Sequence, residues 1–270
     1  MAILTIDHLT INHEDTILVN QVNFSIAEGE WLALVGESGS GKSITASSIG
    51  GILPKELKIV SGRISFNGAD LSNMTEKEYR RIRGKEISYV FQDYQGAFTP
   101  FIKLGNQIDE LLKTHTTLSK KERKKAALSI LKDVNLFDER IYNSYPFQLS
   151  GGQLQRAAIA MAVVLKPKLL IADEPTTALD SMSASRVLGL IAKLKQQMGC
   201  AVLFITHDLR HVKKYANQVA IMKQGKVVEQ GSKESIFENP QHDYTKQLFA
   251  AIPPLRETPS RLFMISENPA

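Results

Sequence analysis

A glycine-rich segment between an apolar run and a helix-compatible stretch constrains this chain more than any other feature. Residues 36–43 read Gly-Glu-Ser-Gly-Ser-Gly-Lys-Ser and fit the pattern G-x-x-x-x-G-K-[ST] without a gap. Residues 31–35 form a short apolar run suited to a buried parallel strand, and residues 44–49 can begin a helix. In such a loop, backbone N–H groups converge on phosphate oxygens, and the helix adds its positive end. The segment therefore predicts a strand, a phosphate-binding loop and a helix.

Two side chains of this loop have separate expected roles. The pattern assigns Lys42 to the β- and γ-phosphates of a nucleotide and the Ser43 hydroxyl to Mg²⁺. The remaining residues of the predicted phosphate site are Gly36, Glu37, Ser38, Gly39, Ser40 and Gly41.

The composition is that of a globular protein without a membrane span. With 270 residues and 43% hydrophobic content, the chain can bury a full core, either as one large domain or as a core with an insert. The longest apolar run, residues 157–165, is far shorter than the roughly 20 residues of a membrane-spanning helix. Residues 1–7 lack the features of a signal peptide, so we expect a cytosolic or peripheral protein. The single cysteine, Cys200, excludes an intrachain disulfide and is expected to be buried.

The formal net charge of +5 is mild, and its densest contributor is the run at residues 120–125. Ser119 and Glu122 have capping-box spacing at the start of this run, and apolar residues then recur on one helical face. A solvated helix face is the favoured interpretation. Nucleic-acid binding is the minority interpretation, because no aromatic residues interleave with the charges to stack on bases.

The order of strand and helix patterns predicts the architecture. Residues 3–66 read mainly as strands and end in a turn at Asn67-Gly68, whereas residues 96–165 read as helical. Beyond residue 165 strands and helices alternate, which predicts a parallel sheet covered by helices, with the helical block as an insert. Helices are predicted at 75–84, 103–113, 119–135, 152–165, 182–198 and 243–251, and later strands at 87–91, 169–172, 201–205, 218–222 and 226–230.

Two acidic residues follow the apolar run at residues 169–172. A buried strand that delivers carboxylates at its C-terminal end places them where parallel sheets bind ligands. Phosphoryl transfer needs an acid that supports Mg²⁺ and a group that positions or deprotonates water. Asp173 suits the first role and Glu174 the second, although two acids can also simply open a surface loop.

A second anion site is indicated at the start of the helix expected at residues 152–165. Ser150 at the N-cap, followed by Gly151, Gly152 and Gln153, offers a hydroxyl, N–H groups and a positive dipole end. The chain has no second lysine-bearing loop to accompany it. The hypothesis is that this helix end serves a nucleotide held by another subunit, and a plain helix cap is the equal alternative.

Three single residues complete the candidate set. Gln92 follows the strand at residues 87–91 and can reach Mg²⁺ or water, Asp180 follows the acid pair, and His207 follows the strand at residues 201–205. An imidazole at that last position can touch a γ-phosphate. Taken alone, each residue is more often structural, and His207 can simply cap the next segment.

The ordered series of motifs resembles the ATP-binding subunit of ABC transporters over residues 3–232. The Walker A motif is Gly36–Ser43, the Q-loop residue Gln92, the signature Leu149–Gln153, the Walker B motif Leu169–Asp173 with Glu174, the D-loop Ala178–Asp180 and the switch histidine His207. The resemblance implies an α/β fold: a P-loop NTPase core with a parallel sheet, an antiparallel β subdomain and an inserted α-helical subdomain. It also implies two subunits that enclose two ATP molecules with Mg²⁺, so that Ser150, Gly151 and Gly152 of one face Lys42 and Ser43 of the other.

The expected division of the chain follows from both arguments. Residues 1–95 and 166–237 are expected to form the ATP-binding core with its antiparallel sheet, residues 96–165 the helical subdomain, and residues 238–270 a C-terminal helix and tail.

One position departs from the family pattern. Family members stack adenine on an aromatic side chain before the phosphate loop, and here that place falls near His13, which offers less stacking area.

The sequences of several segments resemble the oligopeptide/dipeptide/nickel importer branch of this family. The sequences of residues 36–43 and 173–180, and of residues 92–93 followed by 98–100, are similar to those of that branch, and residues 239–248 with 251–253 resemble the branch's C-terminal block. Some members carry a cysteine-rich extension with an iron–sulfur cluster, which this sequence does not support. Residues 51–54 and the short tail resemble nickel or metal-chelate subunits somewhat more than peptide subunits.

The resemblance implies an ATPase that energises an importer from the cytoplasmic face of the membrane. Its expected partners are a second ATP-binding subunit, identical or related, two transmembrane permeases and, indirectly, an extracytoplasmic solute-binding protein. Glu174 would act as general base, Lys42 and His207 would stabilise the γ-phosphoryl, and Ser43, Gln92 and Asp173 would serve Mg²⁺. Gln92 and residues 96–105 would face the permease. The alternatives are a soluble ABC ATPase acting on nucleic acid or the ribosome, and the ATPase of an exporter.

Overall fold

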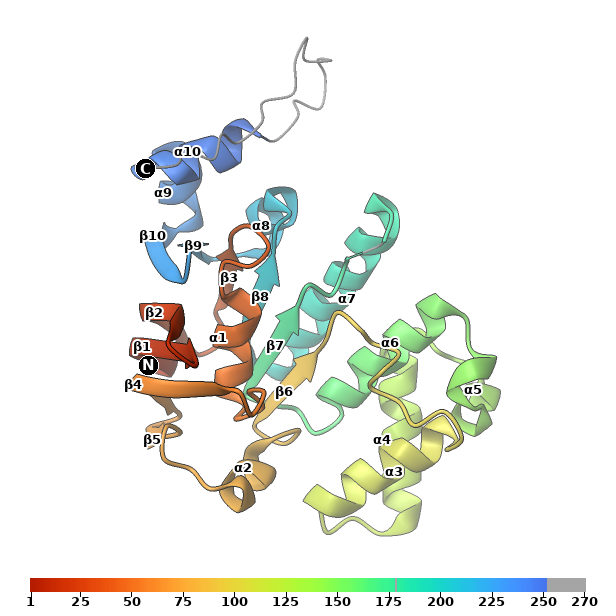
Figure 1. The fold of residues 1–270 in the computed structure, drawn as a ribbon. Coiled ribbons are helices and arrows are strands. Elements are labelled where there is room, and N and C mark those ends of the chain that lie inside the picture. Colours follow the sequence, from red (N-terminus) through yellow and green to blue (C-terminus); the bar gives the residue numbers. More distant parts are fainter. Residues whose placement is uncertain (178, 252–270) are drawn as a thin grey trace.

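The protein is described here by a computed structural model that places residues 1–177 and 179–251. The molecule contains two sheets, of which the larger lies at the centre and the smaller at the side away from the helices α3 to α6, within residues 104–163 (Figure 1). The larger sheet has the strand order β10-β9-β3-β8-β7-β6, and the smaller has the order β2-β1-β4-β5. The strands are β1 Ala2–His13, β2 Thr16–Ala27, β3 Trp31–Val35, β4 Leu57–Phe66, β5 Ala69–Asp70, β6 Ile87–Val90, β7 Leu169–Asp173, β8 Ala201–Thr206, β9 Gln218–Lys223 and β10 Lys226–Ser232.

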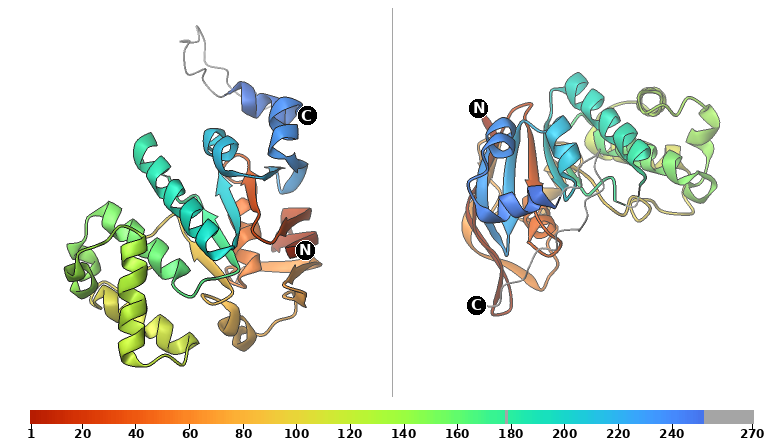
Figure 2. Two further views of the ribbon diagram at one scale, coloured as in Figure 1. Left: turned by 180° about the vertical axis from the view of Figure 1, so that it is seen from behind. Right: turned by 90° about the horizontal axis from the view of Figure 1, so that it is seen from above.

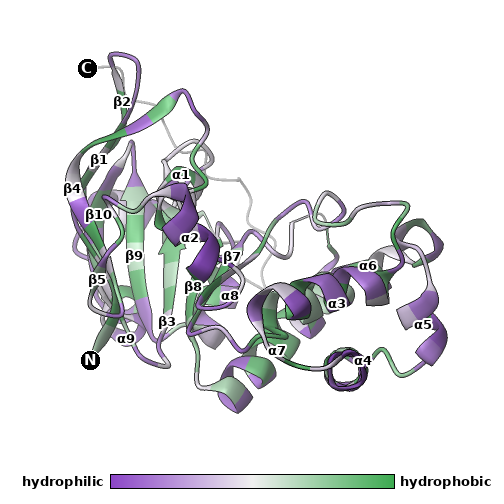
Figure 3. Ribbon diagram, turned by 90° about the horizontal axis from the view of Figure 1, so that it is seen from below, coloured by the Kyte–Doolittle hydropathy of each residue, from purple (hydrophilic) through white to green (hydrophobic). Residues whose placement is uncertain are grey.

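The larger sheet is parallel from β9 to β6, and only its edge strand β10 runs antiparallel. Every residue of β3 and of β8 is buried, as expected for parallel strands that are covered on both faces. Colouring by hydropathy shows these strands as largely hydrophobic, whereas α4 presents a hydrophilic surface (Figure 3). The smaller sheet is antiparallel throughout. The predicted fold class is therefore confirmed.

The two faces of the parallel sheet pack against different partners, because successive side chains of a strand point to opposite faces. Ala33 and Phe204 belong to a core that includes residues of the helices α6 and α7 and of the helical block. Leu34 and Leu203 belong to a second core, which includes residues of α1 and of the antiparallel sheet. The sheet thus joins every layer of the molecule.

The helices surround this sheet, and the block predicted as an insert lies to one side of it, beyond β6 (Figure 2). They are α1 Lys42–Ile49, α2 Glu76–Ile82, α3 Leu104–His115, α4 Lys120–Asp133, α5 Glu139–Asn143, the 3₁₀ helix η1 Pro146–Gln148, α6 Gly151–Val163, α7 Ser181–Met198, α8 Leu209–Tyr215, α9 Lys233–Glu238 and α10 Asp243–Ala250. The exact boundaries of the domains stay a prediction, and the predicted tail lies outside the described residues.

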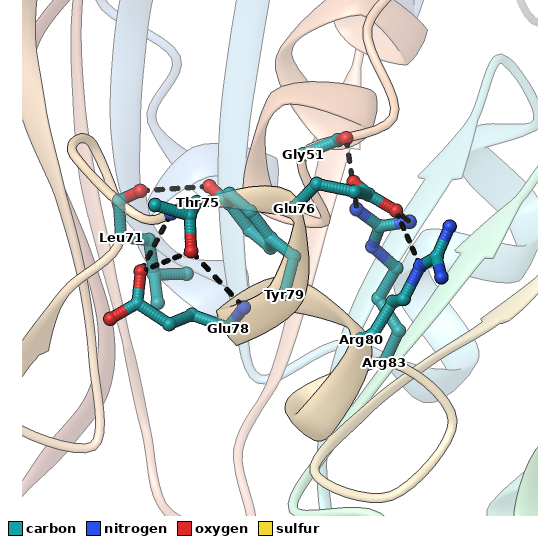
Figure 4. Close-up of polar contacts among 8 residues, drawn as sticks. All are labelled: Gly51, Leu71, Thr75, Glu76, Glu78, Tyr79, Arg80 and Arg83. Carbon is teal, nitrogen blue, oxygen red and sulfur yellow. Dashed lines mark hydrogen bonds and ion pairs between the residues drawn. The ribbon is translucent and has the colours of Figure 1, made fainter.

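Hydrogen bonds at the ends of helices follow the sequence signals. The capping boxes predicted at Thr75–Glu78 and Ser119–Glu122 are both present. Figure 4 shows the first of them, at the start of α2. On the same helix Glu76 pairs with Arg80 and Arg83, and the Tyr79 hydroxyl donates to the Leu71 carbonyl at 2.9 Å. The bond from Tyr79 ties α2 to Leu71, the residue directly after β5 of the antiparallel sheet.

Several elements differ from the sequence-based expectation. The strand expected from residue 63 begins at Leu57, and the short helices α5, α8 and α9 were not predicted. Helices of five to seven residues contain too few apolar repeats for a period to be recognised. Their N-cap residues Asp138, Asp208 and Ser232 carried the available signal.

Cys200 is buried, as predicted, and burial raises the pKa of its thiol to about 11.

Two helical glycines give opposite predictions for stability. A Cβ at Gly105 of α3 would lie 2.4 Å from ring carbons of Tyr142, whereas a Cβ at Gly189 of α7 would lie 3.9 Å from the Tyr215 hydroxyl. We expect Gly105→Ala to lower the free energy of unfolding by about 1–3 kcal/mol through overpacking. Gly189→Ala should raise it by about 0.5–1 kcal/mol, since alanine restricts the unfolded chain. Urea denaturation checks both variants, and equal changes would contradict this packing.

Candidate functional site

The predicted phosphate loop connects β3 to α1, and close contacts require glycine at two of its positions, Gly36 and Gly41. A Cβ at Gly36 would lie 2.1 Å from the carbonyl oxygen of Met222 in β9, so no other residue fits there. Gly41 caps α1 with φ of 100°, in the region that favours glycine, and β2 passes beside it at Leu18. The loop is therefore held between β9 and β2 while its N–H groups sit at the start of α1.

Lys42 is buried inside the loop. Its ammonium donates to the carbonyls of Gly36 at 2.8 Å and Glu37 at 2.6 Å. Burial lowers the pKa of Lys42, while the carboxylates of Glu174 and Asp173 raise it. The loop backbone and the two acids thus compensate a buried cation beside the predicted phosphate position.

Ser43 and Asp173 meet although 130 residues separate them in sequence. The Ser43 hydroxyl donates to Oδ1 of Asp173 at 3.0 Å. Burial raises the pKa of Asp173, and the bond from Ser43 and the charge of Lys42 act in the opposite direction. A hydroxyl and a carboxylate are oxygen ligands of the kind that Mg²⁺ prefers, so the donor set fits this metal.

Glu174 is held in a turn directly after β7. Its N–H donates to the Ile205 carbonyl at 3.0 Å, and its backbone then adopts φ of 45°, which is uncommon for a residue other than glycine. Oε2 accepts a bond from the Thr177 hydroxyl at 2.8 Å, and Oε1 lies 3.6 Å from Nδ1 of His207. The structure thus brings Glu174 and the exposed His207 together at the ends of β7 and β8.

Gln92 and the segment after β6 lie at the surface. Gln92 is exposed, and among the residues that the structure describes its side chain makes no hydrogen bond, so its role toward Mg²⁺ stays a prediction. Two residues further on, Tyr94 approaches the tip of α6: a Cβ at Gly151 would lie 3.3 Å from its hydroxyl oxygen. Sequence reasoning missed this contact between the Q-loop and the signature.

The tip of α6 forms a capping box. Ser150 accepts a bond from the N–H of Gln153 at 3.3 Å, and the Gln153 side chain accepts one from the N–H of Ser150 at 2.9 Å. Ser150, Gly151 and Gly152 are all partly or fully exposed. The hydrogen bonds of Ser150 stay within its own helix, so its predicted role toward another subunit is not decided by one chain.

Gln155, one turn into α6, was also missed by the sequence analysis. This buried side chain donates from Nε2 to the Pro175 carbonyl at 2.8 Å, directly after Glu174. A polar residue among the apolar residues Leu154, Ala157 and Ala158 was the available signal. The bond ties the signature helix to the turn that carries Glu174.

Asp180 and His13 are placed by local structure. Asp180 caps α7 and accepts bonds from the N–H groups of Met182 and Ser183, both at 3.0 Å. Its neighbour Ala178 in the predicted D-loop lies outside the described residues. His13 is exposed at the end of β1 and pairs with Thr16, so adenine stacking on it stays a prediction.

Residues 1–177 and 179–251 lack both a cluster of metal-binding side chains and a membrane-spanning helix. They contain no cluster of three or more His, Cys, Asp or Glu residues able to hold a metal ion. None of the helices in the same ranges combines the length and the apolar character needed to cross a membrane.

Comparison with known proteins identifies the family. The model of the ABC transporter family matches residues 19–177, and the model "Oligopeptide/dipeptide transporter, C-terminal region" matches residues 228–270. The metal-staphylopine import system ATP-binding protein CntD of Staphylococcus aureus (strain NCTC 8325 / PS 47) is 45% identical over 93% of this chain and 93% of its own length. The dipeptide transport ATP-binding protein DppD of Bacillus subtilis (strain 168) is 44% identical over 93% of this chain and 76% of its own length.

A solved structure places the same fold in a nucleotide-bound dimer. It is described as a dimeric, post-hydrolysis state of the ATP-binding cassette MJ0796 bound to ADP and Pi. It shares 31% identity and a TM-score of 0.74 with this protein, over 85% of this chain and 98% of its own. The chain described here therefore belongs to the ABC transporter family and is the ATP-binding, ATP-hydrolysing subunit of an importer of the oligopeptide/dipeptide branch.

Proposed function

We propose that ATP hydrolysis uses the residues gathered at the C-terminal ends of β3, β7 and β8. The observation that carries this proposal is the approach of Lys42, the Ser43–Asp173 pair and the Glu174–His207 pair to one edge of the sheet. Glu174 takes a proton from the attacking water, and His207 and Lys42 stabilise negative charge on the γ-phosphoryl group. Ser43 and Asp173, with Gln92, hold Mg²⁺, which neutralises charge on the phosphate oxygens when bound.

The second half of each ATP site is proposed to come from another ATP-binding subunit. The exposed tip of α6, with Ser150, Gly151, Gly152 and Gln153, offers a hydroxyl and backbone N–H groups to a phosphate across the interface. Asp180, the N-cap residue of α7, belongs to the same proposed interface. The dimeric state of the similar cassette supports this arrangement. The partner is either a second copy or a related chain.

The proposed permease surface is an aromatic cluster within the predicted helical subdomain. Phe101 is 83% exposed and Phe147 is 65% exposed, and their ring centroids lie 6.5 Å apart. Tyr145 stacks on Phe147 at 5.5 Å. Exposed aromatic side chains that gather in one patch are typical anchors of protein interfaces. In the proposed assembly each of the two ATP-binding subunits docks one transmembrane permease through this cluster, as a peripheral subunit on the cytoplasmic face of the membrane.

The proposed cargo is a metal chelate. The protein named as a metal-staphylopine import ATPase matches this chain over 93% of its own length, whereas the dipeptide transport proteins are matched over 76–82% of theirs. A di- or oligopeptide is the second candidate, supported by the match to the C-terminal region of peptide transporters. In either case the permeases and an extracytoplasmic binding protein contact the cargo.

Replacement of the proposed base tests the hydrolytic mechanism. Glu174→Gln keeps the shape of the side chain but removes the proton acceptor, so we expect kcat for ATP to fall about 10²–10⁴-fold with ATP binding retained. Glu139→Gln, at the start of α5, is the matched control and should hydrolyse ATP normally. The measurements are steady-state ATPase assays and direct nucleotide titration. A Glu174→Gln enzyme of wild-type rate would remove Glu174 from this role.

Substitution of the aromatic cluster tests the permease surface. Phe101→Ser with Phe147→Ser should weaken binding to the permeases at least about 10-fold, because buried aromatic anchors dominate interface energies. Phe137→Ser is the control, since Phe137 is 70% exposed and its ring is not among those that pack in the cluster. Co-purification of the assembled transporter and its transport rate are measured. Equal effects of both sets of substitutions would contradict the assignment.

Cargo is tested in proteoliposomes that contain the complete transporter. We expect uptake and ATP hydrolysis to respond to binding protein loaded with a nickel or other metal chelate, and to respond at least about 10-fold less to di- and oligopeptides, because the binding protein must close on its own ligand. Uptake of labelled cargo and phosphate release are the measurements. A response to peptides alone would reverse the cargo assignment and leave the ATPase assignment intact.

A further inference from the structure

The C-terminal part of the chain contacts the phosphate loop through one buried tyrosine. The N–H of Glu37, in the loop, donates to the Tyr244 hydroxyl in α10 at 3.1 Å. The two residues are 207 positions apart, and Tyr244 is only 1% exposed. The sequence resemblance assigned Tyr244 to the C-terminal block and gave it no role at the nucleotide site.

The peptide group that Tyr244 contacts is the one that holds the catalytic lysine. The carbonyl of Gly36 and the N–H of Glu37 belong to the same planar peptide unit. That carbonyl accepts the bond from Nζ of Lys42 at 2.8 Å, while the N–H is bonded to Tyr244 on the other side. The next carbonyl, of Glu37, accepts bonds from Lys42 and from the N–H of Ser40. Tyr244 therefore fixes one end of a hydrogen-bonded chain that ends at the Lys42 ammonium.

Helix α10 is held firmly enough to act as such a support. At its start, the carboxylate of Glu229 in β10 accepts bonds from the N–H groups of Gln241 at 2.7 Å and His242 at 3.0 Å. Farther along, Phe249 of α10 stacks on Phe237 of α9 with ring centroids 4.8 Å apart. Figure 1 shows α9 and α10 together beside the end of β10.

The strands that precede α10 support the same loop. Nζ of Lys223, at the end of β9, lies 4.7 Å from the centre of the Tyr244 ring. In the turn between β9 and β10, the N–H of Gly225 donates to the Ser40 carbonyl at 3.0 Å. The segment from β9 to α10 thus forms hydrogen bonds with the phosphate loop at Glu37 and at Ser40.

We infer that Tyr244 is a positioning residue for the phosphate loop, through which the C-terminal helix α10 sets the affinity of this subunit for nucleotide. The inference rests on the proposed phosphate contact of Lys42. The proposed role is indirect: Tyr244 holds the Gly36–Glu37 peptide in the orientation that directs the Lys42 side chain. Without the hydroxyl the loop backbone gains freedom that nucleotide binding must remove, so binding weakens while chemistry at saturating ATP is preserved.

The test compares Tyr244→Phe with Tyr79→Phe in the full-length chain. Each variant removes one buried hydroxyl bonded to a backbone group and keeps its ring, but the Tyr79 hydroxyl bonds to Leu71, away from the loop. Binding of a fluorescent Mg–ADP analogue is measured by titration, the KM and kcat for ATP by steady-state assay, and exchange of the Glu37 amide hydrogen by NMR or mass spectrometry.

We expect Tyr244→Phe to raise Kd and KM about 3- to 10-fold, the range that corresponds to one neutral hydrogen bond, with kcat changed less than about 2-fold. Exchange at Glu37 should accelerate, and Tyr79→Phe should bind nucleotide as the wild type does. Unchanged binding by Tyr244→Phe, or equal weakening in both variants, would overturn the inference. Lys42→Ala separates the two assignments: if it abolishes binding while Tyr244→Phe has no effect, only the role of Tyr244 fails.

Discussion

The alignment of three parallel strands is the constraint on which the rest of this protein depends. In the hydrogen-bonded register, Val35 of β3 lies beside Thr206 of β8, and Asp173 of β7 lies beside Ile205. The phosphate loop, the acid pair and His207 each begin one residue or less beyond these positions. Because parallel strands end at the same edge, segments more than 100 residues apart in sequence deliver their side chains to one place. A slip of one residue would turn every side chain of a strand to the opposite face.

Burial of that edge makes its charges depend on one another. Burial shifts the pKa of Lys42 downward and that of Asp173 upward, toward the neutral form in both cases. The opposite charges nearby favour the charged forms, and so do the bond that Ser43 donates to Asp173 and the bonds that Lys42 donates to the loop carbonyls. A cation and carboxylates that stabilise one another away from bulk water are poised to accept a strongly charged ligand such as Mg²⁺ with a triphosphate.

Two helices, α6 and α10, are each joined to the candidate site by a hydrogen bond from a buried side chain. Gln155 joins the signature helix to the turn after Glu174, and Tyr244 joins the C-terminal helix to the phosphate loop. Both side chains are buried, so a displaced partner would leave a polar group without a bond, which is costly in an apolar environment. A displacement of the helical block or of the C-terminal helix would therefore act on the turn after Glu174 and on the phosphate loop.

The sequence and the tertiary structure determine different features of the fold and of the candidate site. The phosphate loop, the acid pair, the helix caps at Thr75, Ser119 and Ser150 and the α/β class could be read from the sequence, since each depends on neighbouring residues or a regular period. The bonds Ser43–Asp173, Gln155–Pro175 and Glu37–Tyr244 could not, because their partners are 130, 20 and 207 residues apart. Local pattern determined which groups this chain possesses; only the stacking of strands and helices around a common core decided which of them meet, because contacts between distant residues are set by packing and not by spacing along the chain.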